Sequence, residues 1–222
     1  MLPENIAQFS KQEYATIQKM LHAFAQTHHT SILVGLSHKH GETVSNQATL
    51  FHPDQTEHAY TKRHLIPGLE NAYTKGDSLT KIQKYDTNWG IAICKDLDFV
   101  DTGKDYGKRS INLLLVPAWD FGDDAYLHAR MATLRGVESG FAIARSSRNG
   151  NLSISDNRGR ILSETPVNGD AFTTLVHTFN ASHTPTLYLA LGDWLGWACL
   201  ITSLVSLKYV FKKPLMQGDP NK

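Results

Sequence analysis

The stretch Trp89-Gly90-Ile91-Ala92-Ile93-Cys94 decides the fold, because it is an apolar run that ends abruptly at the charged residues Lys95 and Asp96. A short apolar run bounded by turn residues is typical of a buried strand. A thiol at the end of such a strand is held rigidly and faces polar loop residues whose charge can favour the thiolate. Cys94 is therefore a candidate nucleophile, although a cysteine at a strand end is more often an inert part of the core.

Strand-like and helix-like segments continue on both sides of this run. Apolar residues at three- and four-residue steps predict a helix from Ser10, which can cap it, to about Thr27. A second helix is predicted over residues 123–139, with Gly140 placed to end it. Further strands are predicted at 31–36, 46–51, 82–85, 111–116, 141–146, 152–155 and 172–177. Many strands with few long helices indicate a layered α/β or α+β domain.

Length and composition exclude several classes of protein. The 222 residues fit one domain, or one domain with an appendage, and 41% hydrophobic residues exclude a disordered chain. A net charge of +1 argues against nucleic acid as the main partner, since phosphate binding needs a concentrated basic field. Two cysteines make no disulfide scaffold, the histidines lack zinc-site spacing, and no phosphate-binding glycine loop occurs. No metal or cofactor is therefore predicted.

Residues 194–211 predict one transmembrane helix. Most of these 18 residues are apolar, and the only charged one, Lys208, lies near the end of the segment. At about 1.5 Å per residue the segment spans roughly 27 Å, close to a bilayer core of about 30 Å. Trp194, Trp197 and Tyr209 lie near its ends, as interfacial aromatic residues do. The alternative is a C-terminal helix buried against the domain.

These features divide the chain into a domain over 1–185, a linker over 186–193, the transmembrane helix over 194–211 and a basic tail over 212–222. The positive-inside rule places the tail in the cytoplasm. The domain before the helix would then lie on the outer, periplasmic side of a bacterial-type inner or plasma membrane.

Seven motifs occur in a fixed order between residue 2 and residue 160. They are Leu2-Pro3-Glu4, the run from Tyr60 to Glu70, Gly90-Ile91-Ala92-Ile93-Cys94, Val116-Pro117-Ala118-Trp119-Asp120-Phe121, the run from Ala129 to Glu138, Arg145-Ser146-Ser147-Arg148-Asn149-Gly150 and Asp156-Asn157-Arg158-Gly159-Arg160. Together they resemble the nitrilase (carbon–nitrogen hydrolase) superfamily, which uses a Glu–Lys–Cys triad. Within it the chain looks most similar to the membrane-bound branch of the apolipoprotein N-acyltransferases.

The resemblance implies an α/β fold, a four-layer αββα sandwich, and a triad of Glu4, Lys62 and Cys94. Glu4 would be the general base that takes the thiol proton and passes it to the leaving group. Lys62 would stabilise the oxyanion of the tetrahedral intermediate. Cys94 would attack an acyl carbonyl and form a thioester that a second nucleophile resolves.

The resemblance also implies supporting residues. Glu70 would orient the lysine or the incoming amine, and Asp96 would keep the carboxylate that the branch has near the cysteine. Trp119 and Phe121 would line the acyl pocket, although aromatic core residues are an equal alternative. Glu138 is expected to make a structural ion pair with a neighbouring arginine.

The expected function is thiol-dependent acyl transfer. Its most specific form is N-acylation of the amino-terminal cysteine of a lipoprotein, with a phospholipid as acyl donor. One alternative is hydrolysis of small amides by the same triad, with water as acceptor. Another is a truncated, catalytically inactive module attached to the membrane.

The beginning of the chain departs from the family pattern. Only three residues precede Glu4, where the superfamily has a strand and a helix, and the N-terminal membrane helices of the branch are missing. The sequence is therefore expected to be the C-terminal portion of a longer protein, with a missing N-terminal membrane domain, or a truncated reading frame.

Overall fold

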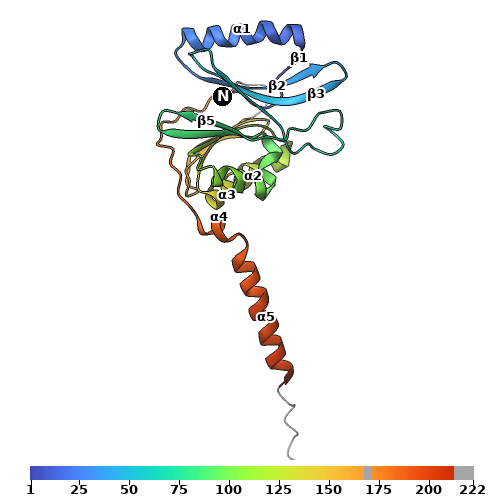
Figure 1. The fold of residues 1–222 in the computed structure, drawn as a ribbon, viewed down its shortest axis with the longest axis vertical. Helices are drawn as coiled ribbons and strands as arrows, with labels where there is room; N and C mark the ends of the chain where they lie inside the picture. Colours follow the sequence, from blue (N-terminus) through green and yellow to red (C-terminus); the bar gives the residue numbers. More distant parts are fainter. Residues whose placement is uncertain (168–171, 213–222) are drawn as a thin grey trace, which may run out of the picture.

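The computed structural model describes residues 1–167 and 172–212. Two β-sheets face each other, and helices cover the outer side of each sheet (Figure 1). The order of the layers is helix, sheet, sheet, helix. This is an α/β sandwich with two separate apolar interiors between its layers.

The first sheet has the strand order β1-β2-β3-β4, with β1 parallel to β2 and the other pairs antiparallel. Its strands are β1 (Gln8–Ser10), β2 (Ile32–His40), β3 (Thr43–Phe51) and β4 (Glu57–Thr61). Helix α1 (Lys11–Thr27) lies on its outer side (Figure 1). Ser10 caps α1 through a reciprocal capping box with Glu13, so the predicted helix and its cap are confirmed.

The second sheet has the order β10-β9-β8-β7-β6-β5. Its strands are β5 (Thr80–Lys84), β6 (Thr87–Ile91), β7 (Leu113–Trp119), β8 (Ala142–Arg148), β9 (Asn151–Ser155) and β10 (Ile161–Pro166). Helices α2 (Val100–Lys108) and α3 (Ala125–Ser139) cover its outer side (Figure 1). Strands β6, β7 and β8 are parallel, so their carboxyl ends meet at one edge. That edge carries Cys94.

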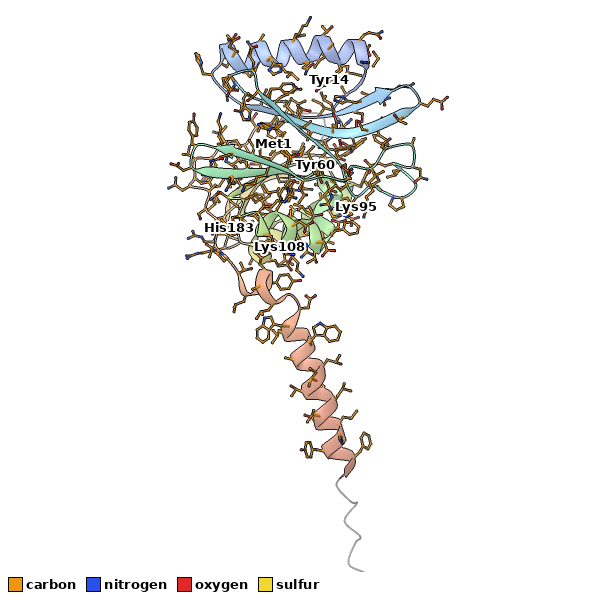
Figure 2. The ribbon with its side chains drawn as sticks, viewed as in Figure 1. Met1, Tyr14, Tyr60, Lys95, Lys108 and His183 are labelled. Atoms are coloured by element: carbon orange, nitrogen blue, oxygen red, sulfur yellow. The ribbon has the colours of Figure 1, made fainter. Side chains whose placement is uncertain are left out.

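Apolar side chains fill the space on both sides of the second sheet. Between the sheets, Leu33 and Leu50 of the first sheet pack with Ile91 and Leu115 of the second. Tyr60 of β4 is buried in the same interior, and Figure 2 shows where it lies between the sheets. The outer interior, under α2 and α3, contains Ile111, Leu114, Val116 and Phe141 among others.

Several local features differ from the sequence-based expectations, among them strands β1, β4 and β10, which were not predicted. Within the described part of the chain, residues 172–177 are not assigned to a strand, because apolar alternation alone does not supply a neighbouring strand. Helix α2 was not predicted, because Gly103 and Gly107 are poor helix formers. Both glycines allow close packing: a Cβ on Gly107 would lie 2.8 Å from the backbone oxygen of Ser139 in α3.

The predicted transmembrane helix is wrong. After the short α4 (Leu187–Leu191), helix α5 (Trp194–Lys212) projects from the domain as one continuous helix (Figure 1). Among the described residues, no helix is long and apolar enough to cross a membrane. Thr202, Ser203, Ser206 and Lys208 interrupt the apolar surface of α5. The topology deduced from a spanning helix, with the domain outside and the tail in the cytoplasm, loses its basis.

The alternative of a buried C-terminal helix is also not what the structure has. The side chains of α5 stand away from the domain on all sides (Figure 2), and those of Trp197 and Leu204 are 65% and 58% exposed. Residues 213–222 of the predicted basic tail lie outside the described residues. The division at residues 185 and 193 remains a prediction, and α4 lies within the predicted linker.

Candidate active site

Glu4 lies in a segment that is hydrogen-bonded to both sheets. The backbone N–H of Glu4 donates to the carbonyl of Ala118 in β7, at 3.3 Å, and that of Ile6 donates to the carbonyl of Gly35 in β2, at 3.1 Å. Gly35 allows this close approach, because a Cβ there would lie 2.7 Å from the Cα of Glu4. The segment therefore places a carboxylate, 3% exposed, between the sheets.

Lys62 follows β4 directly and is completely buried. Its ammonium donates to Glu4 Oε1 at 2.7 Å and to Glu70 Oε1 at 3.1 Å. Asn46 of β3 donates from Nδ2 to the same two oxygens, at 2.7 and 2.9 Å. Lys62 and Asn46 thus hold two carboxylates side by side, which would otherwise repel each other.

Glu70 belongs to the loop after β4 and is fixed at both of its oxygens. Its Oε2 accepts a 2.7 Å hydrogen bond from the backbone N–H of Ile66. In contrast, Glu4 Oε2 is buried and has no hydrogen-bond partner among the described residues. Glu4 is therefore the carboxylate of this pair with an oxygen free to accept a proton.

Charge and burial shift the titration of both partners. Burial raises the pKa of Glu4, although Lys62 and the Asn46 amide oppose that shift. Burial disfavours the charged form of Lys62, but Glu4, Cys94 and Glu70 outweigh it and raise the pKa of the ammonium. The lysine therefore stays charged, and the carboxylate is a stronger base than an exposed one.

Cys94 is the third residue after β6 and begins the 3₁₀ turn η1 (Cys94–Asp98). Its φ of +43° is unusual for a residue with a side chain. The thiol donates to the backbone carbonyl of Trp119, at 3.5 Å from Sγ. Burial first, and then the charge of Glu4, raise the pKa of Cys94 to about 12. The resting thiol is therefore protonated at neutral pH.

Asp96 fixes the turn that carries the thiol and is itself fully buried. Its Oδ2 accepts from the backbone N–H of Ile93 at 3.0 Å and from the Tyr60 hydroxyl at 2.7 Å. Its Oδ1 accepts from the backbone N–H groups of Arg63 and His64, at 3.2 and 2.8 Å, and from His64 Nδ1 at 3.0 Å. Asp96 thus connects the cysteine turn to the loop that carries Lys62.

Two cavities adjoin these groups. Cys94, Lys95, His128 and Arg145 contribute to the lining of a cavity of about 220 Å³. Glu4, Glu70, Tyr73 and Trp119 contribute to the lining of another, of about 200 Å³. Ile66 and Phe121 line both. Trp119 and Phe121, the expected pocket residues, thus both line cavities. Phe121 lines the cavity of Cys94 as well as the cavity of Glu4.

Arg145 and Asp120 form a buried ion pair beside the first cavity. The two Arg145 Nη atoms donate to the two carboxylate oxygens of Asp120 at 2.8 and 2.5 Å. Ser147 also donates to Asp120, at 2.7 Å, and Gly150 leaves room for it, because a Cβ there would lie 1.9 Å from Asp120 Oδ2. The pair supports the strand end that accepts the Cys94 thiol.

Comparison with known proteins identifies the family to which the chain belongs. The carbon-nitrogen hydrolase family matches residues 2–182. The chain belongs to the carbon-nitrogen hydrolase family. A curated relative, the apolipoprotein N-acyltransferase of Geobacter metallireducens, is 26% identical over 154 residues. The match covers 67% of this chain and 29% of that relative, so the chain spans less than a third of the relative's length.

Solved structures of an amidase show the same fold. An amidase from Nesterenkonia sp. superposes with a TM-score of 0.66 at 19% identity, over 71% of this chain and 65% of that chain. A mutant of the same amidase with acrylamide added at its active-site cysteine superposes with a TM-score of 0.65, over 70% and 66% of the two chains, at 19% identity. At this identity the likeness shows the fold alone.

The structure brings together Glu4, Lys62 and Glu70, and couples Cys94 to them electrostatically. Asn46 was missed by the sequence analysis, because an asparagine inside a strand carries no motif. Its only signal was a buried-strand position occupied by a polar residue. Arg135, within its own helix, makes the ion pair expected for Glu138.

Proposed function

We propose that this chain transfers an acyl group through a thioester on Cys94. The observation that carries the proposal is the free oxygen of a buried glutamate held by a buried lysine, next to a protonated thiol. A protonated thiol needs a base when it attacks, and a desolvated carboxylate has the basicity to serve.

The acylation step follows from these groups. The Cys94 sulfur attacks the acyl carbonyl carbon while its proton passes to Glu4. Lys62 has three donors, and two of them are used by Glu4 and Glu70, so the third can hold the oxyanion. The intermediate collapses as Glu4 returns the proton to the leaving group. The product is a Cys94 thioester.

The most specific form of the proposal is N-acylation of a lipoprotein amino terminus from a phospholipid donor. The ordered motifs support this form, as does the relationship to a protein named apolipoprotein N-acyltransferase. That relative is much longer than this chain. Its partners and any membrane location are therefore part of the proposal.

A second candidate is hydrolysis of small amides, which the cavities favour. Volumes of about 220 and 200 Å³ lie below the ~300–1,000 Å³ of pockets for drug-sized ligands. Lys95 is paired with Asp98, and Arg145 with Asp120, so the cations near the thiol are already neutralised. Such a lining suits a small uncharged amide. An inactive module is the third candidate.

Intact-mass spectrometry after incubation with an acyl donor tests the proposal. The protein carries Cys199→Ser, because Cys199 is exposed and would react independently. An acyl adduct formed from phospholipid vesicles, absent in Cys94→Ala, supports N-acyl transfer. Ammonia release from butyramide with no lipid adduct supports the amidase. If neither an adduct nor turnover is observed, the inactive module is the remaining candidate.

Two variants separate the roles of the neighbouring groups. Glu4→Gln should block acylation, because no base remains for the thiol proton. Lys62→Met should slow acylation about 10²–10³-fold, the usual cost of losing an oxyanion donor. Lys81→Met, on the exposed face of β5, is the matched control and should leave acylation unchanged.

A further inference from the structure

Arg148 is a cation near the site to which the proposed function assigns no role. It is the last residue of β8, and its register partner in β7 is Trp119. Leu113 and Leu115 of β7 pack between the two sheets, and side chains alternate along a strand, so Trp119 also faces the inter-sheet space. Arg148, its neighbour, therefore lies on the inner face of the second sheet, at the carboxyl edge that carries the site.

Trp119 connects Arg148 to both catalytic groups. The guanidinium carbon of Arg148 lies 4.6 Å from the centre of the Trp119 ring, which is a cation–π contact. Trp119 lines the cavity of Glu4, and its backbone carbonyl accepts the Cys94 hydrogen bond. The backbone N–H of Glu4 donates to Ala118, the residue before Trp119. The guanidinium therefore lies against a wall residue of the cavity of Glu4.

Arg148 has no carboxylate partner among the described residues. The other cations of the site are paired, Lys62 with Glu4, Lys95 with Asp98 and Arg145 with Asp120. Arg148 is exposed and lines a further cavity, of about 340 Å³, in which none of the described lining residues is acidic. A guanidinium without a counter-ion is suited to bidentate binding of a carboxylate or a phosphate.

We propose that Arg148 binds an anionic group, a phosphate or a carboxylate, on the leaving group of the acyl donor; this rests on the proposed function. Glu4 gives its proton to the leaving group, so the leaving group lies in the cavity of Glu4, beside Trp119. The acyl chain lies in the cavity of Cys94, where the cations are paired. The substrate class is an ester or amide with an uncharged acyl chain and an anionic leaving group, as in a glycerophospholipid or an acylated amino acid.

Pairs of soluble butyryl donors that differ in the anion test the inference. Dibutyryl glycerol 3-phosphate is compared with dibutyryl glycerol, and N-butyrylglycine with its carboxamide. The measurement is kcat/KM for release of the leaving group. It should be about 10- to 100-fold higher for the anionic member of at least one pair, the usual gain from a charge-assisted hydrogen bond. A preference in the glycerol pair indicates a phospholipid-type donor, and one in the amide pair an acylated amino acid.

Two variants of Arg148 test its part in this preference. Arg148→Met keeps an unbranched side chain against Trp119 and should remove the preference, mainly through a higher KM for the anionic donor. Arg148→Lys keeps the charge but not the bidentate geometry and should retain part of the preference. Added salt should weaken the preference of the wild type. Arg158→Met is the matched control, because Arg158 is exposed in the loop between β9 and β10 and lines a different cavity; its replacement should change nothing.

Binding to Cys94→Ala separates the inference from the proposed function. This variant has no thiol at position 94 to acylate, so calorimetric titration gives the Kd of each donor without turnover. The anionic donor should bind at least about tenfold more tightly than its uncharged partner, and Arg148→Met should abolish the difference. Equal binding within both pairs, or a difference that survives Arg148→Met, overturns the inference, whatever the turnover. A difference in binding without turnover or adduct in the protein that has Cys94 overturns the proposed function and leaves the anion site in place.

Discussion

At the scale of single residues, the site is controlled by desolvation. Burial pushes the pKa of Glu4 and of Cys94 upward, and the Lys62 ammonium only partly offsets the two shifts. The result is a neutral thiol next to a basic carboxylate. The proposed mechanism therefore differs from one with a preformed thiolate ion pair, because in it the thiol loses its proton only as it attacks.

Alkylation of the thiol by iodoacetamide should reveal this state. With a pKa of about 12, the thiolate fraction of Cys94 should rise about tenfold per pH unit from pH 7 to 10 with no plateau. The measurement is the alkylation rate in Cys199→Ser. Glu4→Gln should accelerate it, because the charge of Glu4 raises the pKa of the thiol. A plateau near neutrality would show a stable thiolate and contradict the mechanism.

The Asn46 amide should be needed for Glu4 to act as a base. Its hydrogen bond favours the ionised form of Glu4, so Asn46→Leu should raise the pKa of that carboxyl further. Acylation should fall about tenfold or more at pH 6, since hydrogen bonds to charged groups contribute ~1.5–3 kcal/mol. It should recover as the pH rises.

The nearest matched control is Gln47→Leu. Gln47 follows Asn46 in β3, but its amide donates to Thr61 and not to a carboxylate. Its replacement should leave the pH profile of acylation in place. Equal losses in the two variants, at every pH, would mean that β3 and not the Asn46 hydrogen bond had been damaged.

At the scale of elements, the turn η1 depends on Asp96. Asp96, two residues after Cys94, accepts hydrogen bonds from three backbone N–H groups and two side chains. Among the described residues, none of the groups that donate to Asp96 lines either of the two cavities. Its part is therefore to hold the cysteine turn against the loop of Lys62.

Replacement of Asp96 should cost stability as well as activity. In Asp96→Ala the buried N–H groups lose their acceptor, so the free energy of unfolding should fall by about 3–5 kcal/mol. Asp98→Ala is the control from the same turn, because Asp98 makes an ion pair with the partly exposed Lys95; its replacement should cost less than about 1 kcal/mol. Urea denaturation measures both. Similar losses in the two variants would contradict the role given to Asp96.

At the scale of the whole molecule, the site exists only where the two sheets meet. Lys62 follows the first sheet's β4, Cys94 follows the second sheet's β6, and Glu4 lies in a segment that is hydrogen-bonded to both sheets. Helix α5 lies outside this arrangement and projects from the domain (Figure 1). The thermal stability of the protein should therefore depend on the sandwich, whereas α5 should contribute exposed apolar surface.

Removal of residues 193–222 tests this division. Because the α5 side chains are exposed, Tm should change by less than about 2 °C, which corresponds to less than about 1 kcal/mol for a chain of this length. Aggregation should decrease, since the helix presents exposed apolar side chains such as Leu195 and Ile201. Calorimetry and light scattering measure the two effects. A fall of many degrees would show that α5 contributes to the core.

The sequence by itself determined the features that depend on near neighbours along the chain. The cap of α1 at Ser10, the end of α3 at Gly140 and the strand before Cys94 are set by local backbone preference and apolar period. The order of the motifs also indicated the family and pointed to Glu4, Lys62 and Cys94 as candidates.

Only the tertiary structure decided which polar groups meet. The hydrogen bonds of Asn46 to two distant carboxylates, and the cavity that Cys94 and His128 both line, arise because separate sheets and a helix pack together. The tertiary structure also decided that residues 194–211 form an exposed helix, since apolar composition does not say what surrounds a helix.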